Sequence, residues 1–225
     1  MTRADRADSA TSRLAAESLA RDDPTGWFER LYAEAADGRA VVPWDRGGPN
    51  PRLVAWSEER ALAGGGRRAL VVGAGLGDDA EYVAGRGFAT VAFDVSPTAV
   101  ATARRRFPRS GVEYVEADLL DPPAPWRGAF DLVVESITVQ ALPIELHPAA
   151  IERVAAMVAP GGTLLVLSGA RDAHEAVGDG PPWPLTADEI DAFATGGLRA
   201  VRVEDLRDRA DPGVRAWRAE YRRAP

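Results

Sequence analysis

The chain has 225 residues, of which 46% are hydrophobic and 27% are charged, a composition typical of a globular protein with a large core. Its formal net charge of −7 argues against a general affinity for nucleic acid, and no apolar stretch approaches the roughly 18 residues of a membrane helix. The absence of cysteine excludes disulfides and thiolate nucleophiles, and with two histidines we expect no metal site.

The first part of the chain predicts helices that precede a larger α/β core. We expect a helix from Ser9 to Ala20 and a second, amphipathic helix from Trp27 to Ala36. The following stretch, Val42–Leu53, contains three prolines and two glycines, which exclude regular structure before a third helix. We therefore expect a single domain, with a helical or lid segment over residues 1–66 and a core over residues 67–225.

An aromatic residue and an acid lie inside this irregular loop, at Trp44 and Asp45. The indole of Trp44 could cover a ligand while Asp45 holds a polar group on it. Alternatively, Trp44 is a hydrophobic plug beneath a connecting loop. The sequence leaves both interpretations open.

The stretch Arg68–Asp94 predicts a strand, a glycine turn, a helix and a second strand that ends in an acid. Ala69–Val72 has the apolar character of a buried parallel strand. Three glycines follow within five residues, at Gly73, Gly75 and Gly77. Glycine permits a sharp turn and the close approach of a ligand to the backbone. Asp94 follows about 20 residues after them, where a carboxylate can hydrogen-bond a ribose diol. The pattern indicates a nucleoside-binding unit.

Two acids at the start of the predicted helix bear on the identity of the nucleoside. The dinucleotide fingerprint G-x-G-x-x-G would need glycine at the position of Asp78. Asp78 and Asp79 stand where a pyrophosphate would meet the helix, and like charges about 4 Å apart repel by roughly 1 kcal/mol even in water. A phosphate-free cation such as S-adenosylmethionine suits this turn better than NAD. The remaining alternative is a glycine turn that binds nothing.

The rest of the chain continues the alternation of strands and helices. Further strands are expected at Val112–Val115, Ala129–Glu135, Thr163–Ser168 and Leu198–Val203. Pro160–Gly162 predicts a tight turn before the third of these. Val214–Tyr221 is compatible with a last strand or with a short helix.

Several residues near the predicted strand ends are candidates for ligand contact. Asp118 lies on the same carboxyl edge as Asp94 and could accept a hydrogen bond from an adenine amino group, with Leu119 packed on the ring. The alternative for Asp118 is an aspartate that caps a turn. Glu135 ends the fourth strand and would face the methionine part of the ligand. The apolar segment Ile137–Leu142 follows at the mouth of the site and could support cofactor or substrate.

Five segments have the order and spacing of a known superfamily: VVGAGLGDD (71–79), FDVSPTAVATARRRF (93–107), EADLLD (116–121), FDLVVES (130–136) and VAPGGTLLVL (158–167). From about Arg67 onward the chain resembles the class I S-adenosylmethionine-dependent methyltransferases. The resemblance implies an α/β, Rossmann-like doubly wound sheet of seven strands, mostly parallel with an antiparallel last strand, and helices on both faces. It also implies the cofactor contacts, which are Gly73, Gly75, Gly77, Asp94, Val95, Asp118, Leu119 and Glu135.

The irregular loop carries a second resemblance. Pro43, Trp44, Asp45, Gly47, Pro49 and Pro51 match the P-W-D-x-G-x-P-x-P segment of thiopurine and halide/thiol methyltransferases. This implies that Trp44 lies against the cofactor, near the substrate chamber. Glu135 and Ser136 depart from the corresponding segment of those enzymes, which leaves the nucleophile and the substrate open.

We therefore expect a cytoplasmic S-adenosylmethionine-dependent methyltransferase, a monomer or homodimer, without nucleic-acid or membrane partners. Its acceptor would be a small molecule, namely a thiol, a halide, or an aromatic hydroxyl or amine. Glu135 and His147 are the candidates for catalytic help. Candidates for substrate contact are Trp27, Trp44, Ile137, His174 and Trp183.

Two alternatives from other functional classes remain. The chain could be a catalytically silent protein that binds S-adenosylmethionine as a regulator or partner subunit. It could also be a nicotinamide-dependent oxidoreductase, which Asp78 in place of glycine disfavours.

Overall fold

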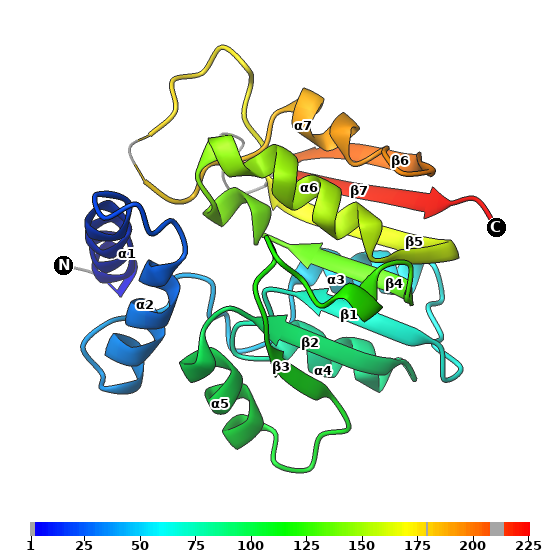
Figure 1. The fold of residues 1–225 in the computed structure, drawn as a ribbon, viewed down its shortest axis with the longest axis horizontal. Helices are drawn as coiled ribbons and strands as arrows, with labels where there is room; N and C mark the ends of the chain where they lie inside the picture. The colour runs from blue at the N-terminus through cyan, green and yellow to red at the C-terminus, as the bar shows by residue number, and fades with distance from the viewer. Residues whose placement is uncertain (1–2, 179, 208–213) are drawn as a thin grey trace.

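A seven-stranded sheet is the centre of the computed structural model, which describes residues 3–178, 180–207 and 214–225. Its order is β3-β2-β1-β4-β5-β7-β6 (Figure 1). The strands are β1 (Arg68–Val72), β2 (Ala89–Asp94), β3 (Glu113–Glu116), β4 (Phe130–Ser136), β5 (Val158–Gly169), β6 (Leu198–Arg207) and β7 (Arg215–Arg223). β1 to β5 pair in parallel, and β7 is antiparallel to both of its neighbours. The predicted doubly wound sheet is confirmed, and its last segment is a strand.

Helices cover both faces of this sheet. One face carries α3 (Pro51–Glu59), α4 (Asp78–Gly85) and α5 (Pro97–Arg106), and the other carries α6 (His147–Ala156) and α7 (Ala187–Ala192). The alternation of a strand distributes its side chains between the two layers. In β1, Ala69 and Val71 pack in the first layer, whereas Leu70 and Val72 pack in the second. Both faces of the central strands are therefore buried.

Two further helices lie beyond the carboxyl ends of the parallel strands. These are α1 (Arg3–Leu19), which begins earlier than predicted, and α2 (Gly26–Ala36) (Figure 1, left). Glu29 of α2 joins this pair to the core, because its carboxylate accepts hydrogen bonds from the Ser96 hydroxyl at 2.5 Å and from the Thr98 N–H at 3.0 Å. The acid thereby stabilises the N-terminus of α5 and fixes α2 next to the carboxyl ends of the strands.

The structure differs from the predicted turn at Pro160–Gly162. These residues lie within β5, which begins at Val158, and the pairing with β4 shifts register between Phe130 and Leu132. The extra residues form an irregularity in the strand, and Gly161, at φ +69°, adopts the left-handed conformation that such a bulge favours.

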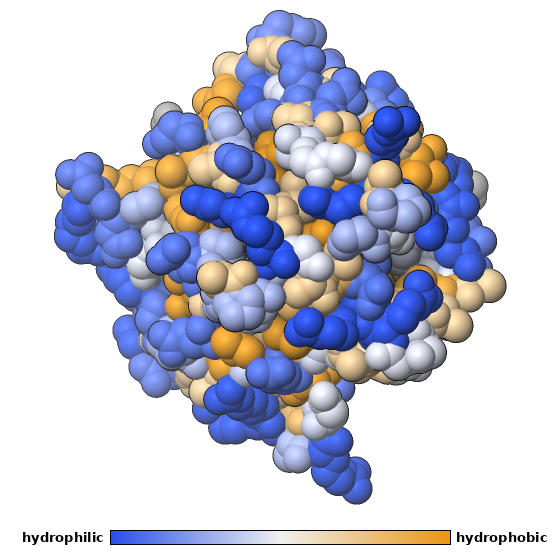
Figure 2. Space-filling view, turned by 45° about the vertical axis from the view of Figure 1, so that its right-hand side comes forward, coloured by the Kyte–Doolittle hydropathy of each residue, from blue (hydrophilic) through white to orange (hydrophobic). Residues whose placement is uncertain are grey.

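The surface is mainly hydrophilic on the face shown in Figure 2, with apolar side chains scattered between charged ones. Among the residues whose exposure the structure describes, the exposed large hydrophobic ones are Val177, Val201, Val203 and Val214. Of the helices in the described ranges, none is both long and apolar enough to cross a membrane.

Candidate active site

A cleft of about 1040 Å³, partly open to solvent, lies at the carboxyl ends of β1, β2 and β4. The strand order reverses between β1 and β4, and in open α/β sheets ligands bind at such a switch point. The glycine turn, the loop that contains Trp44 and helix α2 all contribute residues to the lining of the cleft. The first loop of the sheet and the N-terminal segment thus share one site.

The three glycines of the turn are all in the left-handed region, with φ of +60° at Gly73, +53° at Gly75 and +95° at Gly77. A Cβ on Gly73 would lie 2.3 Å from the Thr138 hydroxyl oxygen, and one on Gly77 would lie 2.6 Å from the Tyr114 hydroxyl oxygen. The first and third glycines are therefore required by the packing of the protein itself. All three line the cleft.

Asp94 lies at the end of β2, 6% exposed, with both carboxylate oxygens oriented by the backbone. One oxygen accepts the N–H of Gly75 at 2.9 Å, and the other accepts the N–H of Ser96 at 2.9 Å. Burial raises the pKa of this carboxyl to about 6, against the effect of these hydrogen bonds. The side chain is a fixed acceptor inside the cleft, and Val95 lines the cleft next to it.

Asp118 and Leu119 line the cleft beyond β3. The Asp118 carboxylate accepts the N–H of Leu120 at 2.8 Å, so it caps a turn as the alternative interpretation expected. That bond leaves further acceptor capacity on the same carboxylate. The Asp118 carboxylate can therefore cap the turn and still accept a hydrogen bond from a ligand in the cleft.

Trp44 also lines the cleft, and its indole N–H donates to the Tyr32 hydroxyl at 2.7 Å. Burial raises the pKa of Tyr32 well above its ordinary value, so the hydroxyl keeps its proton. The pair lies over Gly75, whose Cβ would meet the Tyr32 oxygen at 2.9 Å and the Trp44 nitrogen at 3.5 Å. Trp44 is thus a wall of the cleft. Sequence reasoning did not single out Tyr32, because no local pattern links it to Trp44.

Negative charge predominates in the cleft. Among the described residues that line it, five are carboxylates and one is a guanidinium: Asp45, Asp78, Asp79, Asp94, Asp118 and Arg46. Arg106 pairs with Asp78 at 2.8 Å and so reduces the repulsion expected from that acid. Burial raises the pKa of Asp79, although its carboxylate accepts the N–H of Asn50 at 2.6 Å. Acceptors, aromatic rings and net negative charge suit a cationic nucleoside.

The two residues predicted to be catalytic lie outside the cleft. Glu135 is 0% exposed, and one carboxylate oxygen accepts the N–H groups of Thr138 at 2.7 Å and Val139 at 3.0 Å. His147 is also 0% exposed, and its ring nitrogens contact Glu189 and the Leu142 carbonyl. Neither residue lines the cleft, so these positions do not support the predicted catalytic roles, nor the cofactor contact of Glu135.

Three of the predicted substrate contacts are also placed elsewhere. Trp27 is 0% exposed and stacks on Phe28 at 3.9 Å, behind the cleft. His174 is exposed on the loop after β5, and Trp183 is buried, with its indole N–H donating to Gly178. Ile137 does line the cleft, as does Leu142 at the other end of the apolar segment expected at its mouth, and so does Phe28, which sequence reasoning had not proposed as a contact.

The sequence of this chain is similar to those of known methyltransferases. Residues 69–162 match the family described as "Methyltransferase domain". A probable thiol methyltransferase 2 from Arabidopsis thaliana is 28% identical over 188 residues, which cover 79% of this chain and 81% of that protein. A 2-heptyl-1-hydroxyquinolin-4(1H)-one methyltransferase from Mycobacteroides abscessus is 28% identical over 167 residues, covering 72% of each.

A solved structure supports the fold. The 1,6-didemethyltoxoflavin-N1-methyltransferase of Burkholderia thailandensis, solved with its substrate and S-adenosylhomocysteine, superposes with a TM-score of 0.66 at 17% identity, over 87% of this chain and 86% of that chain. The matched family agrees with three features of the structure, namely the strand order, the glycine turn and the acid at the end of β2. Residues 69–162 match a methyltransferase domain, and the chain has the fold of the class I S-adenosylmethionine-dependent methyltransferases.

Proposed function

We propose that the cleft binds S-adenosylmethionine and that the protein transfers its methyl group to a small acceptor that is already nucleophilic near neutral pH. A thiol is the acceptor class we favour. The similarity to a protein named as a thiol methyltransferase supports this choice, as does the P-W-D-x-G-x-P-x-P match in the loop around Trp44.

The observation that carries the proposal is the set of ionisable groups in the cleft. No histidine, glutamate or lysine is among the described residues that line it, and the chain has no cysteine. Tyr32 holds its proton, and Asp94 is bonded to two backbone N–H groups. An aspartate is a weak base toward a phenol of pKa about 10, whereas a thiol of pKa about 8.5 ionises readily without help.

The residues of the cleft would then bind and align. Bound S-adenosylmethionine supplies a methyl group on a cationic sulfur. Asp94 is placed to accept hydrogen bonds from ribose hydroxyls, and Asp118 from the adenine amino group, with Leu119 against the ring. Phe28 and Trp44 would enclose the acceptor and exclude water. Alignment of this kind can contribute about 7–11 kcal/mol to a displacement reaction.

An acceptor series tests this proposal. We expect thiophenol to be methylated faster than phenol at pH 7, by at least about thirtyfold, which is the ratio of ionised fractions for an alkyl thiol of pKa about 8.5 and a phenol of pKa about 10, because an aromatic thiol is more acidic still. The measurement is release of S-adenosylhomocysteine with thiophenol, phenol, aniline or iodide as acceptor. Equal rates for phenol and thiophenol would mean that a base in the cleft takes the proton of phenol, and that result would contradict the proposal. Binding of cofactor without turnover of any acceptor would favour the silent regulator.

The pKa of Asp94 predicts that S-adenosylhomocysteine binds more weakly in acid. With a pKa of about 6, the carboxylate is largely ionised at pH 8 and largely protonated at pH 5. Protonation removes acceptor capacity, so the affinity at pH 5 should be about one tenth of that at pH 8. Titration calorimetry across this range is the measurement. Asp94→Asn should bind weakly with a flat profile, and an equally steep profile in that variant would assign the effect to another group.

Replacing Trp44 by alanine should impair turnover more than folding. The substitution removes one wall of the cleft and the donor to Tyr32, so we expect kcat/KM to fall at least tenfold. The melting temperature should fall by no more than about 4 °C, which corresponds to roughly 1 kcal/mol in a chain of this size. A variant that melts earlier but has normal kinetics would make Trp44 a structural plug.

A further inference from the structure

The segment Ile137–Leu142 forms the wall of the cleft that follows β4, and within it the N–H groups of Ala141 and Leu142 donate to the carbonyls of Thr138 and Val139. Its only helical part is the short 3-10 turn Val139–Ala141. Ile137 has a φ of +58°, an unusual and strained conformation for a β-branched residue. A wall with this geometry needs fastening from outside the segment.

Glu135 fastens the first end. One of its carboxylate oxygens accepts the consecutive N–H groups of Thr138 and Val139, directly after the strained Ile137. The Thr138 hydroxyl then donates to the Val72 carbonyl at 3.0 Å, next to the glycine turn. The other Glu135 oxygen is buried without a hydrogen-bond partner among the described residues. Both backbone hydrogen bonds that this buried carboxylate accepts therefore come from the Ile137–Leu142 wall.

His147 fastens the other end. Its Nε2 lies 2.9 Å from the Leu142 carbonyl, and its Nδ1 lies 2.6 Å from a carboxylate oxygen of Glu189. Burial alone would raise the pKa of Glu189, but hydrogen bonds from His147 and Thr186 lower it to about 2. The two ring nitrogens thus face two acceptor oxygens, one on Glu189 and one on Leu142. Glu189 holds the ring, and the ring holds Leu142.

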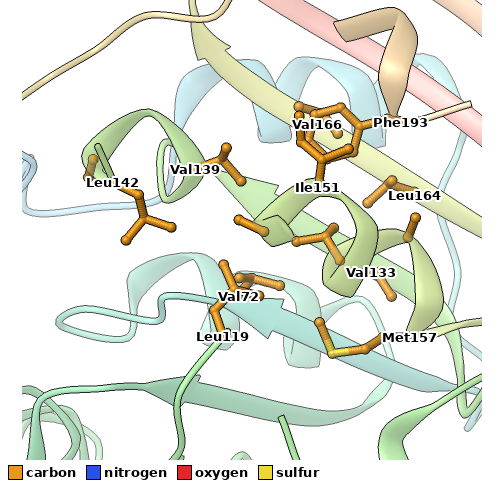
Figure 3. Packing of buried hydrophobic residues seen from close by; sticks show 14 of the residues in the cluster. Val72, Leu119, Val133, Val139, Leu142, Ile151, Met157, Leu164, Val166 and Phe193 are labelled. Carbon is orange, nitrogen blue, oxygen red and sulfur yellow. The ribbon is translucent and has the colours of Figure 1, made fainter. Parts of the chain in front are cut away.

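The middle of the segment is held by packing and by Gln140, whose backbone carbonyl accepts the N–H of Trp183 at 2.6 Å and whose side-chain oxygen accepts the N–H of Gly169 at 2.5 Å. Val139 and Leu142 project from it into the same buried cluster as Val72 and Leu119 (Figure 3). Val72 and Leu119 also line the cleft. A displacement of the wall would therefore change the shape of the site on two sides.

We propose that Glu135 and His147 are positioning residues that hold the Ile137–Leu142 wall from behind, one at each end, and so set the fit of the acceptor without touching it. The assignment of this wall to the acceptor rests on the proposed function. The contacts by which Glu135 and His147 hold the wall do not depend on the proposed function.

Amide hydrogen exchange of the full chain tests the fastening without any acceptor. In Glu135→Ala and His147→Ala, amides of residues 137–142 should exchange at least tenfold faster, while those of β1 keep wild-type rates. Glu135→Gln keeps a carbonyl oxygen that accepts both N–H groups, and the His147→Gln amide can reach the Leu142 carbonyl. Both should retain most of the protection of the wall.

Thr90→Val is the matched control, because it removes the bond of a buried hydroxyl to the Phe88 carbonyl at the opposite end of β2. It should leave the wall unchanged. Unchanged exchange of residues 137–142 in both alanine variants would overturn the proposal. Equal acceleration in β1 would also overturn it, because that result means general destabilisation.

Kinetics with thiophenol separate positioning from proton transfer. A positioning role predicts a kcat within about threefold of wild type for Glu135→Gln, and a raised KM for thiophenol in Glu135→Ala and His147→Ala. A general base would lose about 10²–10⁴-fold on the glutamine substitution, which would overturn the assignment. If wild type does not methylate thiophenol, the proposed function fails while hydrogen exchange still decides on the wall.

Discussion

Asp94→Ala is expected to weaken the binding of S-adenosylhomocysteine by well over tenfold, or more than about 1.4 kcal/mol. The substitution removes the proposed ribose acceptor and also leaves the N–H groups of Gly75 and Ser96 without their partner. The glycine turn would lose the contact that orients it toward the ligand. Titration calorimetry on wild type and variant measures the effect.

Asp131→Ala provides the control for this experiment. Asp131 also accepts a backbone N–H at the end of a strand, that of Arg68 at 2.9 Å, but at the opposite edge of the sheet. Its loss should leave the affinity unchanged. Normal affinity in Asp94→Ala would remove Asp94 from the site, and an equal loss in both variants would show a general effect on the sheet.

Gly73→Ala is expected to have the second large effect, on both stability and binding. The new Cβ would lie 2.3 Å from the Thr138 hydroxyl oxygen and 2.7 Å from its methyl carbon, at a φ of +60°. Backbone strain together with overpacking should lower the free energy of unfolding by about 2–4 kcal/mol. The glycine turn and the Ile137–Leu142 wall would also be forced apart. Urea unfolding and calorimetry with S-adenosylhomocysteine measure the two effects.

Gly65→Ala separates the clash from the strain. Gly65 has nearly the same φ, +58°, and a Cβ there would meet nothing within 4 Å. This control should lose only about 1 kcal/mol, the strain of the backbone conformation, and bind normally. Equal losses at the two positions would mean that the contact with Thr138 has no effect.

The features that sequence predicted well depend on local patterns. Apolar runs and glycines within Arg68–Asp94 define the first βαβ unit, and the carboxyl ends of parallel strands must meet at one edge. Gly73, Asp94 and Asp118 therefore line one cleft, as their spacing indicated. Whether they contact the cofactor stays a prediction.

Glu135 shows where the same reasoning failed. A position at the end of β4 suggested contact with the ligand, but successive residues of a strand point to opposite faces. Glu135 lies next to Val72 in the sheet register, and its carboxylate bonds the backbone of the segment that follows. Ser136, the next residue in the chain, does line the cleft.

The other misplaced residues depend on contacts between distant parts of the chain. His147 and Glu189 are 42 residues apart, and no local pattern links them. On α2, helical periodicity grouped Trp27 with the aromatic residues near it. The orientation of α2 on the core, fixed by Glu29, buries Trp27 and turns Phe28 toward the cleft.

The most direct test of the central claim is titration calorimetry of the wild-type chain with S-adenosylhomocysteine and, separately, with NAD. A cleft lined by carboxylates and lacking the third glycine of the dinucleotide fingerprint should bind one S-adenosylhomocysteine per chain. It should give no binding heat with NAD. Binding of NAD without binding of S-adenosylhomocysteine would contradict the account.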